Sequence, residues 1–299
     1  MDLSTCTSVT KRVAATAAAS ALAAGALVAA SATPAQAVVA STDYVCAVPT
    51  VGSFTVPVRM DVPALDAVTQ INAGQTVPES LMNLGGTHAV DLTFGLPATL
   101  AGTLTSLGGV SALDLPDFGL GLGDASVPLA GAAIGAIRSG DAGALLVGAT
   151  ATNGAFTTPV AGDYPILMPR TFTMVPTVGA LGPVPITCAT ENPGTVKTLP
   201  VVKNTSATTA KPAKKKFVKG QAAKLKAVVT GQTLTPSGKV VAKKGAKTVG
   251  RGTLDDAGKA VINLGKLKPG VHRFTVKYLG SGYHDKSATE GPVTVKVVR

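Results

Sequence analysis

Short stretches of alternating hydrophobic and polar residues recur along the first half of the chain. In one of them, Phe54, Val56 and Val58 alternate with threonine, proline and arginine. A period of two places such hydrophobic side chains on one face of a β-strand. Because Pro57 cannot donate a backbone hydrogen bond, we expect this strand to lie at the edge of a sheet. Similar patterns predict strands at residues 90–94, 145–149, 172–175 and 184–188.

One segment has helical spacing instead. Leu100, Leu104 and Leu107 follow Pro97, and Gly108-Gly109 come directly after them. Proline is favoured in the first turn of a helix and glycine just beyond its end, so one short helix is predicted here. The glycine-rich segment 119–123 is predicted to be a loop.

The second half alternates more regularly. Residues 225–229 alternate as a strand, Asp255–Gly258 predicts a hairpin turn, and Lys268–Gly270 predicts a second turn. Further strands are predicted at residues 260–264, 272–278 and 293–297. Roughly seven short strands in residues 216–299 fit the size of an immunoglobulin-like sandwich. The whole pattern predicts an all-β fold with two β-sandwich domains, of which the C-terminal one is immunoglobulin-like.

The N-terminal segment has the features of an export signal. Lys11 and Arg12 precede an uncharged stretch, residues 13–33, and the triplet Ala35-Gln36-Ala37 follows. A basic region, an apolar region and small residues at the cleavage site predict a cleavable signal peptide over residues 1–37. The alternative is an uncleaved membrane anchor, which the alanine-, serine- and threonine-rich composition of the apolar stretch disfavours. We therefore expect a secreted protein without an integral membrane span after cleavage, either released or held peripherally at the cell wall.

Cleavage would remove Cys6 and leave Cys46 and Cys188. An even number of cysteines in an exported protein favours a disulfide, which would join the first strand of one domain to its last. A nucleophilic Cys46 is the disfavoured alternative, since only His88 lies nearby in the sequence.

Charge divides the mature chain into two units. The protein has 299 residues, 14% of them charged, and a net charge of +11. Residues 38–195, the acidic unit, hold three basic and eleven acidic residues, a net charge of −8. Residues 196–299 hold twenty-two basic and four acidic residues, a net charge of +18. Within them, the lysine-, proline- and threonine-rich residues 196–215 predict an extended linker, which leaves residues 216–299 as the basic unit.

The basic unit resembles the bacterial Ig-like domains of group 3 that occur in secreted and surface proteins. The resemblance rests on residues 254–260 and on residues 267–287, where a turn and a strand ending in Tyr278 precede a glycine-containing loop, Tyr283 and Ser287. It implies a spacer, a display stalk or an adhesive module, and it carries no catalytic residues.

The acidic unit is similar to a domain of unknown function in secreted actinobacterial proteins. The resemblance rests on Val45–Pro49, Phe54–Pro57, His88–Pro97 and Ile166–Cys188. It implies no particular chemistry.

Catalytic and metal-binding motifs are absent from the sequence. It contains no His-Glu-x-x-His, no Gly-x-Ser-x-Gly and no phosphate-binding loop, and no cofactor or metal site is expected. Of the three histidines, His272 should lie partly buried on a strand, whereas His88 and His284 fall in predicted loops. The resemblance to Ig-like domains implies that Tyr278 lies in the core and Tyr283 over the adjoining loop, rather than in a sugar-binding platform.

The lysines are the strongest candidates for binding. The run contains Lys211, Lys214, Lys215, Lys216 and Lys219. Such a dense field of lysines attracts polyanions, while export and the lack of interleaved aromatic residues argue against nucleic acid.

The leading hypothesis is a non-catalytic secreted or cell-envelope protein with a structural, adhesive or spacer role, whose basic unit associates with anionic wall polymers. The alternative hypothesis is a secreted hydrolase that acts on wall or matrix material through carboxylates of the acidic unit, although Asp114, Asp117, Asp255 and Asp256 are more simply interpreted as turn residues.

Overall fold

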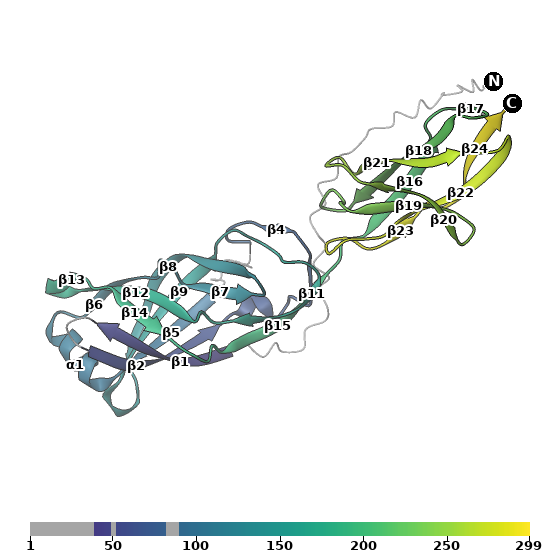
Figure 1. Ribbon diagram of the computed structural model, residues 1–299. Helices are drawn as coiled ribbons and strands as arrows, with labels where there is room; N and C mark the ends of the chain where they lie inside the picture. The colour runs from purple at the N-terminus through teal and green to yellow at the C-terminus, as the bar shows by residue number, and fades with distance from the viewer. Residues whose placement is uncertain (1–38, 49–51, 82–89) are drawn as a thin grey trace, which may run out of the picture. The chain divides into compact units, whose positions relative to one another are not determined.

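The computed structural model describes residues 39–48, 52–81 and 90–299 (Figure 1). The predicted signal peptide and His88 lie outside the described residues. Strands make up most of the described chain, and its only α-helix is α1 (Ala98–Ser106). The all-β prediction is therefore confirmed.

The acidic unit is built on one sheet of thirteen strands. The strands are β1 (Val39–Val48), β2 (Gly52–Asp61), β3 (Ile71–Asn72), β5 (Val90–Leu96), β6 (Val110–Asp114), β7 (Gly119–Leu122), β8 (Ala125–Ser139), β9 (Leu145–Asn153), β11 (Gly162–Leu167), β12 (Thr171–Val178), β13 (Gly182–Pro183), β14 (Ile186–Ala189) and β15 (Thr195–Val202). Their order is β13-β12-β14-β1-β2-β5-β9-β8-β7-β11-β15-β3, and β6 also pairs with β12. Smaller elements are the two-stranded sheet of β4 (Thr76–Val77) and β10 (Phe156–Thr157), and the 3-10 helices η1 (Pro63–Leu65), η3 (Asp141–Gly143) and η4 (Gly179–Leu181).

The long strand β8 lets this sheet enclose a core. It pairs with β7 at its start and with β9 along the rest, and the β8–β9 ladder is interrupted at two irregularities. Bulges of this kind bend a strand and increase its twist. Side chains from both portions of the sheet then share one hydrophobic cluster. At its centre the ring of Phe172 lies 4.9 Å from the rings of Tyr44 and Phe118 and 6.1 Å from that of Phe94.

The alternation in β2 predicted its buried side chains but not its place in the sheet. Val56 and Val58 are buried as expected. The predicted edge position is wrong, because β2 pairs with β1 on one side and β5 on the other. The β2–β5 ladder begins at Val58, one residue after Pro57, and Gly95 of β5 leaves room for the proline ring. A proline therefore fits an inner strand where the ladder on one side ends.

Two further local predictions have opposite outcomes. The short helix is confirmed, since α1 begins directly after Pro97 and buries Leu104. The predicted loop at residues 119–123 is wrong, because Gly119–Leu122 forms strand β7, with Leu120 and Leu122 buried. Alternate leucines provide the buried face there, and the glycines take the other positions.

The predicted linker is also different in the structure. Thr195–Val202 is strand β15 of the acidic unit, where Val196, Leu199 and Val201 are buried. Ser206–Pro212 is strand β16, which pairs with a strand of the basic unit. Some of the polar residues that suggested an extended linker are exposed, such as Thr198 and Thr209, but Thr208 is buried and Lys197 donates to the carbonyls of Leu65 and Val68. The acidic unit therefore ends at Val202, and the basic unit begins at about residue 205.

The basic unit is a sandwich of two sheets around its own core. One sheet has the order β16-β18-β21, with β18 (Ala222–Gly231) and β21 (Lys259–Lys266). The other has the order β17-β24-β22-β19-β20, with β17 (Phe217–Val218), β24 (Val293–Val298), β22 (Gly270–Tyr278), β19 (Lys239–Lys244) and β20 (Lys247–Thr253), and β23 (Ser287–Ala288) pairs with β22. The turn at Asp255–Gly258 forms as predicted, but it connects strands β20 and β21 of different sheets and is therefore not a hairpin turn.

Candidate functional site

The predicted disulfide between Cys46 and Cys188 is present, with a sulfur–sulfur distance of 2.05 Å. The two cysteines lie opposite each other on β1 and β14. The bridge does not join the first strand of the unit to its last, because β15 follows β14 and belongs to the same sheet. Both cysteines are fully buried, so this pair is part of the scaffold.

The five predicted polyanion-binding lysines lie in one exposed segment of the basic unit. Lys211 is near the end of β16, Lys214, Lys215 and Lys216 connect β16 to β17, and Lys219 follows β17 directly.

Backbone contacts hold this lysine segment to both sheets. The backbone N–H of Ala213 donates to the carbonyl of Lys224 at 2.9 Å, and that of Lys219 donates to the carbonyl of Val298 at 2.8 Å. Between them, the buried side chain of Phe217 anchors β17, which pairs with the last residues of β24 (Figure 1). The segment is therefore fixed at the end of the sandwich where β18 begins and β24 ends.

The fold brings lysines from later in the chain to the same end. Lys266 is the register partner of Ala222 at the start of β18, and Lys268 lies in the turn that follows β21. Lys224 points outward from β18 next to them. We call the combined surface the basic end, and it comprises Lys211, Lys214, Lys215, Lys216, Lys219, Lys224, Lys266 and Lys268. Sequence reasoning did not include Lys266 and Lys268, because only strand pairing places them there.

Carboxylates occupy other parts of the basic unit. Asp255 and Asp256 lie in the turn that bonds to Val229, near the opposite end of β18. Asp285 also lies there, since its backbone N–H donates to the carbonyl of Asn204, just before β16. Glu290 precedes β24 and follows Thr289, which bonds to Val276 in the second half of β22. Among the described residues, no lysine of the basic end forms an ion pair. The side chains of these lysines are exposed.

The histidines are structural in the described part of the chain. The Nε2 atom of His272 lies 2.8 Å from the carbonyl oxygen of Lys268. The imidazole ring is stacked against the ring of Phe274, and His272 is a partly buried strand residue, as expected. His284 was predicted in a loop, but only 1% of it is exposed, and its Nε2 lies 3.1 Å from the carbonyl oxygen of Leu234. Such a buried imidazole cannot reach a polymeric substrate.

Tyr278 lies in the core, as expected. Tyr278 is 1% exposed and its hydroxyl donates to the carbonyl of Ser237 at 2.7 Å, whereas Tyr283 is 39% exposed.

Three carboxylates of the acidic unit have defined surroundings in the structure. Asp117 accepts hydrogen bonds from the backbone and hydroxyl of Thr173, so it ties a turn to β12. Asp61 and Asp91 are register partners on β2 and β5. Burial raises the pKa of Asp61, and the negative charge of Asp91 raises it further. Within the described ranges, no group of three or more histidine, cysteine or acidic residues is arranged to hold a metal ion.

None of the helices in the described ranges has both the length and the hydrophobicity needed to cross a membrane.

Residues 205–298 match the family model of the bacterial Ig-like domain (group 3). This confirms the resemblance of the basic unit and agrees with a domain that begins near β16. The similarity of the acidic unit to an actinobacterial domain remains a prediction. No curated protein matches the chain.

Solved structures give only weak likenesses. A putative membrane anchored protein from Corynebacterium diphtheriae is 14% identical with a TM-score of 0.37, covering 88% of this chain and 59% of that one. The adhesin InvE of Yersinia pseudotuberculosis is 14% identical with a TM-score of 0.28, covering 76% of this chain and 56% of that one. Fibronectin(III)-like modules of Clostridium thermocellum CbhA are 13% identical with a TM-score of 0.25, covering 77% of this chain and 88% of those modules. Such low TM-scores support no argument about function. This chain also spans only 59% of the Corynebacterium protein's length.

Proposed function

We propose that this is an exported, non-catalytic protein with an adhesive or spacer role, and that its basic end binds anionic polymers of the cell envelope. Phosphate- and uronate-bearing wall polymers are the expected partners. The signal-peptide pattern of residues 1–37 supports export, and the Ig-like domain over residues 205–298 supports a binding or spacer role.

The observation that carries this proposal is the separation of charge within one small sandwich. Eight lysines gather where the β16–β17 segment meets the start of β18, while three of the four carboxylates lie toward the other end. A flexible polyanion needs a field of cations rather than a shaped pocket. Its binding releases condensed counter-ions and therefore weakens as salt is added.

Like charges within the unit support the same function. Lys211 of β16 is the register partner of Lys226 of β18, and both side chains are exposed. Like charges directly opposite each other on a sheet destabilise it. A bound polyanion would relieve this repulsion, so binding should also stabilise the folded unit.

The test uses the purified full-length protein and two immobilised polymers, inorganic polyphosphate and polygalacturonate. One variant combines Lys214→Glu, Lys215→Glu and Lys216→Glu at the basic end. The control combines Lys239→Glu, Lys259→Glu and Lys286→Glu, three exposed lysines that lie away from the basic end, with the same change of net charge.

We expect the wild-type protein to bind both polymers at low salt and to be released before about 1 M NaCl, where the Debye length is only about 3 Å. The basic-end variant should elute at much lower salt than the control variant. Retention that persists at about 1 M NaCl would contradict an electrostatic interaction. Equal loss of binding in the two variants would show that net charge acts without a defined surface.

A further inference from the structure

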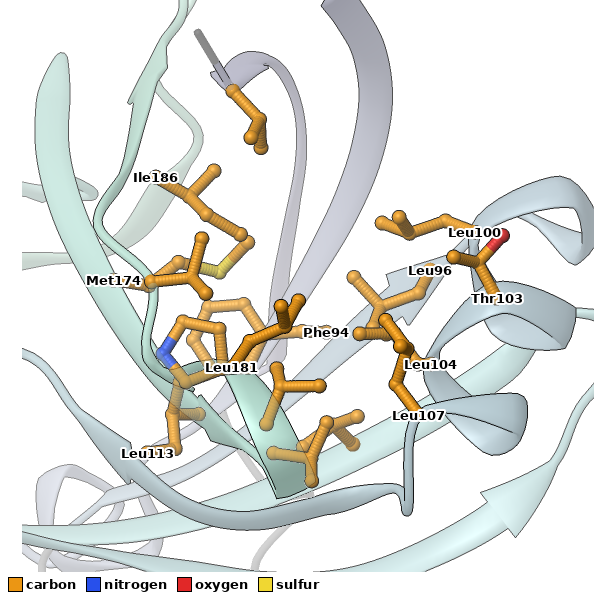
Figure 2. Close-up of a pocket in the computed structure, with 16 residues that line it drawn as sticks. Phe94, Leu96, Leu100, Thr103, Leu104, Leu107, Leu113, Met174, Leu181 and Ile186 are labelled. Atoms are coloured by element: carbon orange, nitrogen blue, oxygen red, sulfur yellow. The ribbon is translucent and has the colours of Figure 1, made fainter. Parts of the chain in front are cut away.

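The acidic unit contains an apolar cavity that the proposed function does not use. Its volume is about 300 Å³. Leu100, Leu104 and Leu107 line it from α1 and the residue after it, and Met174 and Ile186 line it from β12 and β14 (Figure 2).

The wall of this cavity offers almost nothing polar. Of the lining residues, only Thr103 has a side-chain oxygen or nitrogen, and its hydroxyl donates to the carbonyl of Thr99 at 3.2 Å. A sugar, an ion or a peptide would lose its hydrogen bonds to water without finding partners here, which is unfavourable. A hydrocarbon chain has no hydrogen bonds to water to lose, and its transfer out of water is favourable.

The cavity can be reached from outside. Leu181 lines it and is 60% exposed, while Leu107 and Val184 are partly buried lining residues. An exposed apolar side chain beside a cavity that opens to water favours an apolar occupant.

The walls are also fixed in place. The backbone N–H of Gly109 donates to the carbonyl of Leu104, and the N–H of Gly179 donates to the carbonyl of Gly109. These bonds tie the end of α1 to η4, which carries the lining residue Leu181. A preformed site binds more tightly, because less ordering is needed when the ligand enters.

We propose that this cavity binds the hydrocarbon chain of a lipid, with the polar head group at the mouth beside Leu181. Its volume is about twice that of the roughly 150 Å³ apolar cavity that accommodates benzene, which corresponds to a chain of roughly a dozen carbon atoms. The chain could come from a free fatty acid or from an acyl lipid of a membrane. This proposal is independent of polyanion binding by the basic end.

The absence of tryptophan from the chain allows a direct test. Leu181→Trp places a single tryptophan at the mouth, and Leu81→Trp places one at a 54% exposed position that does not line the cavity. The full-length variants are titrated with the neutral fluorophore N-phenyl-1-naphthylamine, then with dodecanoic acid, hexanoic acid or phosphatidylcholine vesicles as competitors.

A second pair of variants tests the volume. Val184→Phe fills the cavity, and Val45→Phe makes the same change at a 58% exposed position on β1. Thermal unfolding of each variant shows whether it is folded. If Val184→Phe does not fold, the tryptophan pair alone decides the outcome.

We expect energy transfer from the tryptophan of Leu181→Trp to the fluorophore, much weaker transfer in Leu81→Trp, and displacement by dodecanoic acid but not by hexanoic acid. Folded Val184→Phe should bind at least about tenfold more weakly than Val45→Phe, a difference of about 1.4 kcal/mol. Displacement by vesicles as well would identify an acyl lipid as the source, whereas displacement by the free acid alone would identify a fatty acid. Equal transfer in the two tryptophan variants, equal binding by the two phenylalanine variants, or no binding by wild-type protein would overturn the proposal.

Discussion

Cys46 and Cys188 are direct register partners on the antiparallel strands β1 and β14, with Cα atoms 4.0 Å apart, although 142 positions separate them in the sequence. The covalent bond therefore closes a very long loop between two strands that are neighbours in the folded sheet. In the chain-entropy model, closing a loop of this length raises the free energy of the unfolded chain by up to about 5 kcal/mol.

Replacing both cysteines, in Cys46→Ala/Cys188→Ala, should therefore lower the free energy of unfolding by about 2–5 kcal/mol. Chemical denaturation of the acidic unit, followed with and without reductant, measures this loss. Reductant should destabilise the wild-type protein to a similar extent and leave the double variant unchanged. A double variant as stable as oxidised wild type would contradict the prediction.

Asp61→Asn should stabilise the protein at neutral pH. Burial and the facing charge of Asp91 raise the pKa of Asp61 in the folded state, and one of its oxygens is buried without a hydrogen-bond partner in the structure. The folded protein then binds the proton more readily than the unfolded chain, so stability falls as pH rises from the ordinary aspartate pKa through the raised one. The gain from Asp61→Asn should be absent in acid, grow over that interval and persist at neutral pH.

Thermal unfolding across this pH range checks the prediction, with Asp43→Asn on the exposed face of β1 as the control. A pH-independent difference between Asp61→Asn and wild type would show that ionisation of this carboxyl does not affect folding.

Tyr278→Phe should weaken the basic unit without affecting polyanion binding. The buried hydroxyl of Tyr278 donates to the carbonyl of Ser237 at 2.7 Å, and removing one such hydrogen bond costs about 0.5–1.5 kcal/mol. The exposed Tyr283→Phe is the matched control and should change stability by less than about 0.5 kcal/mol. Denaturation and polyphosphate binding of both variants provide the readouts. Loss of polymer binding by folded Tyr278→Phe would mean that this ring contributes to recognition.

Gly179→Ala should destabilise the acidic unit strongly. A Cβ at this position would collide with the backbone carbonyl oxygen of Leu107, which cannot move without shifting the end of α1. Overpacking of this kind costs about 1–3 kcal/mol or more. Gly102→Ala, within α1, has nothing within 4 Å of the added Cβ and should instead stabilise by about 0.5–1 kcal/mol. Equal effects of the two changes on denaturation midpoints would show that a Cβ at position 179 does not clash with the backbone of Leu107.

The helix and many of the strands could be predicted because their signals are local. Residues 225–229 and residues 54–58 alternate with a period of two, and α1 has proline before it and glycine after it. The pairing of Cys46 with Cys188 was also predictable, since only two cysteines remain after the predicted signal peptide.

Other features depended on what lies beside each segment. The alternate glycines of β7 suggest a loop in the sequence. In the structure this segment is a strand, because Leu120 and Leu122 pack into the core. The lysine- and threonine-rich residues of β15 and β16 suggest a linker in the sequence. In the structure they are strands, because neighbouring strands form hydrogen bonds with their backbones. Pro57 suggested an edge strand because the sequence does not show where a ladder stops.

The sequence alone therefore determined the β-rich class, the division of charge and the lysine run, because residue spacing and composition specify these directly. Only the tertiary structure decided that Lys266 and Lys268 join this run and that leucines after Pro97 meet Met174 and Ile186 around a cavity. The physical reason is that strand pairing and side-chain packing connect residues far apart in the chain, so no local pattern contains that information.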